Sequence, residues 1–170
     1  VLCVCVGQSA LWWLQAVYVL YLRDQIKLSD AQIMYQVAAG SLGLALTVRQ
    51  WGRYADRFGS IPAIMFSLTA YAIISLGWIA LTPGATWTLP LAWILVILGN
   101  IFNGAAMMAM NRGMLRRVRD KGRVGYTNIW IACTALATGL TPIVACIFVE
   151  WLQLAGYRLC FVLTAITSLL

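Results

Sequence analysis

The sequence predicts an all-α membrane protein whose chain crosses the bilayer several times. Of its 170 residues, 62% are hydrophobic and 10% are charged, whereas a soluble domain carries about 45–50% apolar and 25% charged residues. The mean hydropathy is +0.85. So few charges cannot cover the surface of a soluble globule, and so many apolar residues are incompatible with disorder. The third observation is that the apolar residues fall into six long runs.

These six runs are the expected membrane helices. A spanning helix needs about 20 mostly apolar residues, and the last run is shorter than that. We expect helices at residues 1–22, 30–51, 61–82, 88–111, 125–150 and 157–170, forming one domain over residues 1–170. The chain begins with Val1, shows no signal-cleavage pattern and ends inside an apolar run, so we expect it to be a piece of a longer polypeptide.

Local signals support several of the expected helix ends. Ser29, followed three residues later by Gln32, predicts a capping box at the start of the second helix. Pro62 and Pro90 are expected in first turns, where a missing N–H costs no helical hydrogen bond. Pro142 lies inside the fifth segment and predicts a kink there.

Charges in the connections predict how the chain is oriented in the membrane. Three cations, Arg23, Lys27 and Arg158, lie on one side, and nine lie on the other. The nine are Arg49, Arg53, Arg57, Arg112, Arg116, Arg117, Arg119, Lys121 and Arg123. Loops rich in Lys and Arg stay in the cytoplasm, so we expect loops 52–60 and 112–124 to be cytoplasmic and the protein to lie in the inner or plasma membrane. The second loop could also contact anionic lipid headgroups, whereas no nucleic-acid partner is expected.

The composition argues against most kinds of catalytic and cofactor site. The chain has no histidine, which removes His-based triads, His metal sites and imidazole proton relays. Its five cysteines form no C-x-x-C pair and are expected to pack as small apolar residues. It also lacks a G-x-S-x-G motif, a phosphate-binding loop and paired carboxylates inside the spanning segments. We therefore expect no enzyme, no metal site and no cofactor.

The connection between the second and third segments carries a motif of glycines and charges. Residues 52–59 read Gly-Arg-Tyr-Ala-Asp-Arg-Phe-Gly, which is G-x-x-x-D-R-x-G. At a junction between two spanning helices, this motif resembles the signature loop of the major facilitator superfamily. Residues 22–24, Leu-Arg-Asp, and residues 28–32, Leu-Ser-Asp-Ala-Gln, also resemble that family's first outer loop. The resemblance covers the whole chain as one six-helix half of such a transporter.

Departures from the family pattern indicate which half this is. Ser60 and Ile61 stand where the family motif usually continues with two basic residues. The fourth segment lacks the Arg that the N-terminal half often carries there. It has instead Gly99, Asn103, Gly104 and Asn111. The resemblance therefore implies the C-terminal half, with an N-terminal six-helix half as its missing partner.

The motif is also the candidate gating loop, made of Gly52, Arg53, Asp56, Arg57 and Gly59. Gly52 would let another helix come close, and Gly59 can adopt the positive φ of a tight turn. Asp56 could meet a helix N-terminus, and the two arginines could pair with acids or headgroups. The resemblance implies that this loop latches the cytoplasmic gate against the other half. A tight turn with topology-setting arginines is the alternative.

Polar side chains inside the spanning segments mark a candidate solute pathway, because such groups rarely face lipid. By helical spacing, three of them share one face of the first helix and three share one face of the fourth. The candidates for substrate contact are Gln8, Trp12, Gln15, Asn100, Asn103 and Met107. The resemblance implies that these helices border a central cavity, although the amides could instead bond between helices. The small residues at 38–43 predict close packing of the second helix.

The resulting expectation is secondary active or facilitative transport of a small solute by alternating access, this chain being one half of the transporter. Its uncharged polar lining favours a neutral or amphiphilic solute. No Asp or Glu lies in the middle of a segment, so a proton-coupling carboxylate would belong to the missing half. The expected partners are the solute, that half and membrane lipids. The alternative is a non-transporting polytopic membrane subunit or scaffold.

Overall fold

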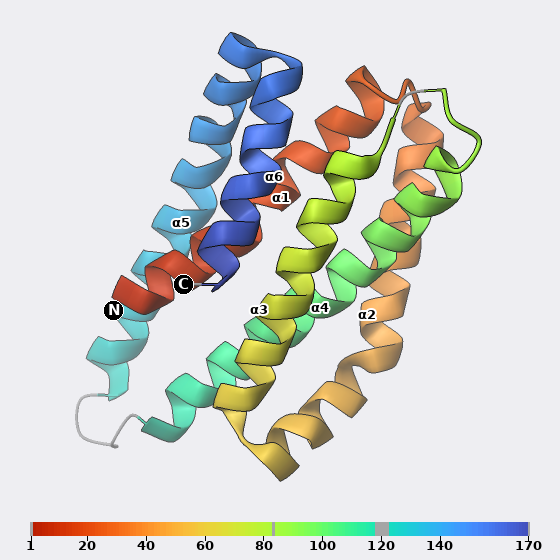
Figure 1. The fold of residues 1–170 in the computed structure, drawn as a ribbon. Helices are drawn as coiled ribbons and strands as arrows, with labels where there is room; N and C mark the ends of the chain where they lie inside the picture. Colours follow the sequence, from red (N-terminus) through yellow and green to blue (C-terminus); the bar gives the residue numbers. More distant parts are fainter. Residues whose placement is uncertain (1, 83, 118–122, 170) are drawn as a thin grey trace.

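The computed structural model describes residues 2–82, 84–117 and 123–169, with side chains described except at 2–7, 10, 115–117, 123, 124 and 126. This part of the chain folds into α-helices, with a short 3₁₀ turn and no β-strand (Figure 1). The elements are α1 (Leu2–Asp24), α2 (Asp30–Phe58), α3 (Ser60–Gly77), η1 (Trp78–Ala80), α4 (Thr88–Arg117), α5 (Arg123–Leu152) and α6 (Leu154–Leu169). The all-α prediction is confirmed.

Several of these helices are long and apolar enough to cross a membrane. Within the described residues these are α2, α3 together with η1, α4 and α5. Helix α6 is apolar as well but has 16 residues, fewer than the roughly 20 that a spanning helix needs. The chain is therefore a multi-pass membrane protein, as predicted.

Two connections are shorter than expected. Residues 52–58, predicted to belong to a loop, complete α2, and Gly59 alone separates α2 from α3. Apart from Gly52, the motif residues are ordinary helix residues, and one interior glycine does not end a helix. At the second basic connection α4 continues to Arg117 and α5 begins at Arg123, while residues 118–122 lie outside the described residues. Five of the cations predicted for this connection have side chains that lie outside the described ones: Arg116, Arg117, Arg119, Lys121 and Arg123.

The predicted helix-start signals are confirmed. Ser29 Oγ accepts a hydrogen bond from the Gln32 N–H at 3.3 Å, and the Ser29 N–H donates to Gln32 Oε1 at 3.1 Å. These two bonds form the predicted capping box. Pro62 and Pro90 each stand at the third position of a helix, α3 and α4 respectively. Pro142 lies inside α5, which continues on both sides of it, and the kink stays a prediction.

Replacing Ser29 by Ala is expected to destabilise the protein by about 1 kcal/mol, because the α2 N-terminus loses its side-chain acceptor. Thermal unfolding of the purified protein in detergent measures the change. Ser41→Ala is the matched control, since Ser41 Oγ is exposed and donates only within its own helix, to Val37 O at 3.0 Å. Equal melting temperatures for the two variants would contradict the capping role.

The helices pack as two groups (Figure 1). Helix α1 packs mainly on α5 and α6, whereas α4 packs mainly on α2 and α3. Helices α3 and α6 pack against each other and join the groups, while α1 and α4 contact each other little. In the sequence the helices form two successive triplets, α1–α3 and α4–α6. The first helix of each triplet, which is predicted to border the solute pathway, thus packs on the second and third helices of the other triplet. This pattern matches the nested three-plus-three repeats found in some transporter halves.

An aromatic core fixes α1 against η1 and α6. The rings of Tyr21, Trp78, Tyr157 and Phe161 lie with centroids 5.3–6.3 Å apart. The Tyr21 hydroxyl donates to Leu81 O at 2.9 Å, and the Tyr157 hydroxyl donates to Asp24 Oδ2 at 2.9 Å. These contacts anchor the end of α1 against η1 and α6.

Candidate functional site

The turn between α2 and α3 is built on Gly59. Its φ is +96°, and its N–H donates to Ala55 O at 3.1 Å, which closes the end of α2. L-residues with a side chain rarely adopt such a φ. The expectation of a positive-φ glycine at this position is confirmed.

Asp56 forms an ion pair with Arg112 of α4. The same guanidinium donates to Gly52 O at 3.4 Å. The Arg112 side chain therefore contacts two motif residues that lie one helical turn apart on α2. The side chains of Arg112 and Asp56 are 33% and 52% exposed. From the sequence we expected Asp56 to meet a helix N-terminus, and we counted Arg112 only among the cations that indicate the orientation in the membrane. The structure adds Arg112 to the candidate gating residues.

The other motif residues face outward or pack lightly. Arg53 and Arg57 are exposed, and the guanidinium of Arg57 lies 5.4 Å from the centre of the Phe58 ring. A Cβ at Gly52 would lie 4.0 Å from Met108 Sδ, which is ordinary contact. Nothing within the described part of this chain therefore requires a glycine at position 52. The helix predicted to approach Gly52 closely would have to lie outside the described residues.

Small residues bring α2, α3 and α4 together beside this ion pair. Ala55, Ala63 and Ala109 are buried against one another, and a Cβ at Gly113 would lie 3.4 Å from Ser60 Cβ. Close packing of small residues lets helix backbones approach in membranes. The end of α4 that carries Arg112 is thereby held against the α2–α3 turn.

A groove runs between α2 and α4 toward the ion pair. Its volume is about 550 Å³. Its lining includes Leu44, Val48, Met107, Met108, Asn111 and Arg112. Gly104 is part of the same wall, and Leu44 lies against it so closely that a Cβ there would be 2.7 Å from Leu44 Cδ2. Apolar and thioether side chains thus line most of the groove, and its polar side chains are Asn111 and Arg112.

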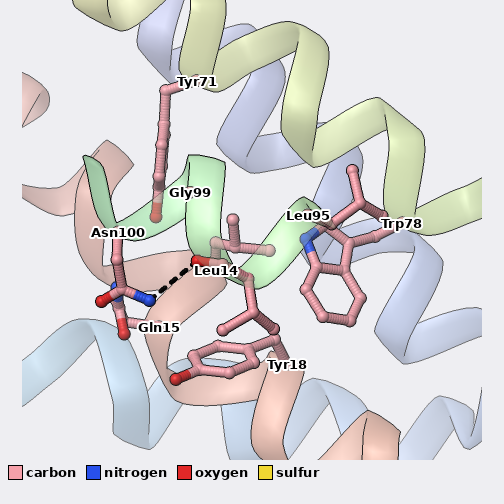
Figure 2. A pocket seen from close by; sticks show the side chains of 9 residues that line it. Leu14, Gln15, Tyr18, Tyr71, Trp78, Leu95, Gly99 and Asn100 are labelled. Carbon is pink, nitrogen blue, oxygen red and sulfur yellow. Dashed lines mark hydrogen bonds between the residues drawn. The ribbon is translucent and has the colours of Figure 1, made fainter. Parts of the chain in front are cut away.

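A second, much smaller cavity lies between α1, α3, η1 and α4 (Figure 2). Polar groups from all four elements line it, namely Gln15, Tyr18, Tyr71, Trp78 and Asn100. Asn100 Nδ2 donates to Val96 O at 2.9 Å, and the Tyr71 hydroxyl donates to Leu11 O at 3.0 Å. Gln15 and Asn100, predicted from different helices to share one pathway, therefore border the same cavity.

Comparison with known proteins shows which family the chain belongs to. The family model described as Major Facilitator Superfamily matches residues 1–170. The chain belongs to the major facilitator superfamily. No curated protein and no solved structure matched it. Members of this superfamily are membrane transporters of small solutes, so membrane transport is the activity that the family assigns, and the prediction from the signature motif is confirmed.

Within this superfamily fold, the predicted substrate residues do not form one cluster. Gln15 and Asn100 border the small cavity and Met107 lines the groove, whereas the remaining three line neither of them. Gln8 is fully buried, and its Nε2 donates to Met110 Sδ at 3.6 Å, which joins α1 to α4. The remaining residues, Trp12 and Asn103, are partly buried.

Helix α2 contributes polar and small residues near Asn100 that sequence reasoning did not assign to the site. Gln36 is fully buried, and neither Nε2 nor Oε1 has a hydrogen-bond partner among the described residues. One turn further, Gly40 packs on Asn100, since a Cβ there would lie 2.6 Å from Nδ2. The small residues predicted close packing, which is confirmed. Gln36 follows Gln32 by four residues, but Gln32 is explained by the capping box, and the small residues after Gln36 continue no polar stripe that would have marked position 36.

Proposed function

We propose that this chain forms one six-helix half, the C-terminal one, of a transporter that moves a small solute by alternating access. In this proposal the solute binds between this half and an N-terminal half, and the two halves rock about it. The family match over residues 1–170 supports the proposal. The packing of α1 and α4 on opposite triplets supports it as well.

The single observation that carries the gating part of the proposal is the Asp56–Arg112 ion pair. It ties the α2–α3 turn to α4, which is one of the two helices proposed to border the pathway. In the proposal this unit, with Gly52, Arg53, Arg57 and Gly59, closes the cytoplasmic side against the other half. Because Arg112 belongs to both the ion pair and the groove, a change in the pair changes the groove wall directly.

The proposed solute contacts are side chains of α1 and α4: Gln8, Trp12, Gln15, Asn100, Asn103 and Met107. Their side chains carry no formal charge, so they favour a neutral or amphiphilic solute that accepts and donates hydrogen bonds. The groove supports this class, because Met107 and Met108 are flexible thioethers that adapt to apolar ligands. Proton coupling, if present, would use a carboxylate of the other half.

The proposal is tested by uptake into vesicles that contain the purified full-length protein. Isotope-labelled hexoses serve as neutral probes and a lipophilic fluorescent dye as an amphiphilic one. Saturable uptake at least about tenfold above protein-free vesicles is expected for one of them. A folded, monodisperse protein that moves no member of a wide solute panel would favour the scaffold alternative.

A residue-level test uses the transported probe. Asn103→Leu is expected to raise KM by roughly tenfold, because one lost hydrogen bond to a bound solute costs about 1–1.5 kcal/mol. Asn128→Leu is the matched control, since Asn128 lies exposed on α5, which is not one of the two helices proposed to border the pathway. Equal KM values for both variants would remove Asn103 from the binding site.

A further inference from the structure

The small cavity between α1, α3, η1 and α4 has room for a single water molecule and for no metabolite. The space open to a water centre is about 10 Å³, and a buried water needs at least roughly 10–15 Å³ by that measure. A solute the size of a sugar needs a site of several hundred Å³. Gln15 and Asn100 are only partly buried, so a solute would meet them from outside this cavity, and the cavity itself needs another explanation.

Trp78 supplies an unsatisfied donor to this cavity. Its side chain is 1% exposed, and its Nε1 has no hydrogen-bond partner among the described residues. In Figure 2 the indole nitrogen lies on the side of the ring that faces the other lining residues. An indole N–H can only donate, and leaving it unpaired in the interior costs about 1–3 kcal/mol. The position thus calls for an acceptor that the side chains alone do not provide.

Acceptors for a bridging molecule lie on the other walls. Tyr71 donates its hydroxyl proton to Leu11 O at 3.0 Å, which leaves the lone pairs of its oxygen free to accept. The Tyr18 hydroxyl lies beside the Asn100 amide, and Gln15 adds a further amide to the lining. One donor and several acceptors around a volume of this size meet the requirement of two to four polar partners for a buried water.

We propose that this cavity is a binding site for one ordered water molecule. The water accepts a hydrogen bond from Trp78 Nε1 and donates its protons to oxygens of the opposite wall, Tyr71 Oη among them. It thereby connects η1 and α3 with the polar faces of α1 and α4. This role is independent of which solute the protein carries.

The location gives the water a mechanical consequence. Helices α1 and α4 belong to different packing groups and contact each other little, so a water at their seam adds to the few direct contacts there, such as the bond from Gln8 to Met110. A bridging water is nearly as favourable as a direct hydrogen bond and can reorient. This link between α1 and α4 can therefore break and re-form without unpacking either group of helices.

Water-to-indole magnetisation transfer tests the proposal. The full-length protein is prepared with ¹⁵N-labelled tryptophan in lipid nanodiscs, and Trp78→Phe assigns the Trp78 indole signal by its loss. We expect a cross-peak between the Trp78 indole proton and a long-lived water. If the assigned signal shows contacts only to carbon-bound protons, the proposal is overturned.

A matched pair of variants tests the acceptor side. Tyr71→Phe keeps the ring and removes the oxygen, so the Trp78 indole proton should shift upfield and its water cross-peak should weaken or vanish. Tyr157→Phe removes a hydroxyl from the neighbouring aromatic core but not from the cavity, and should leave both unchanged. Identical Trp78 signals in wild type and Tyr71→Phe would contradict the assigned acceptor. Should Tyr71→Phe fail to fold, the wild-type cross-peak still decides.

Discussion

Gly156→Ala is expected to reduce the stability of the protein by about 3 kcal/mol or more, the largest effect of any single methyl addition that the structure suggests. A Cβ at position 156 would lie 2.7 Å from the Phe148 carbonyl carbon and 2.8 Å from Val149 Cα. Both atoms belong to the backbone of α5, so no side chain can rotate away. The helical hairpin between α5 and α6 would have to open, and overpacking of this kind costs about 1–3 kcal/mol even where neighbours can move.

The measurement is the yield of monodisperse protein in detergent together with its melting temperature, which should fall by roughly 6–12 °C for a chain of this size. Gly139→Ala is the matched control, because Gly139 lies within α5 and a Cβ there meets nothing within 4 Å. That variant should be unchanged or up to about 1 kcal/mol more stable, since Ala favours helix. A wild-type melting temperature for Gly156→Ala would show that α5 and α6 are not packed this closely.

The hairpin shows which parts of the fold the sequence could reveal. Apolar runs and cap signals predicted each helix, because they report on local energetics and on the bilayer. Gly156 carries no such signal, since its role depends on a backbone carbonyl eight residues earlier that only the three-dimensional turn brings close. The same holds for Gly40, whose neighbour Asn100 is 60 residues away in the sequence.

The candidate site was predictable to a similar extent. Helical spacing placed Gln15 and Asn100 on inward faces, and they border one cavity. Spacing alone could not reveal that Trp78 closes that cavity, because Trp78 lies at the end of a nearly uniform apolar segment. Nor could it identify Arg112 as the partner of Asp56. Ion-pair partners on different helices depend on how the helices pack, whereas charge counting treats every arginine of a loop alike.

Asp56→Asn should separate gating from simple structural support. The pair of Asp56 with Arg112 is one-third to half exposed, and ion pairs of that kind contribute only about 0–1 kcal/mol to stability. Asn keeps the shape and an acceptor oxygen while removing the charge. We therefore expect a melting temperature close to wild type and an uptake rate up to about fivefold lower, since about 1 kcal/mol between the two conformations corresponds to about fivefold.

The matched control is Asp30→Asn at the opposite end of α2. Asp30 also faces an arginine, Arg23, at 3.8 Å, and both side chains are mostly exposed. Loss of that charge should leave uptake unchanged. The exchange variant, Asp56→Arg combined with Arg112→Asp, should recover part of the lost rate if attraction between the two charges holds the conformation. Because each single variant of the exchange places two like charges side by side, recovery in the double variant measures their coupling directly. Wild-type uptake in Asp56→Asn, at wild-type expression, would leave the motif as a tight turn with topology-setting arginines.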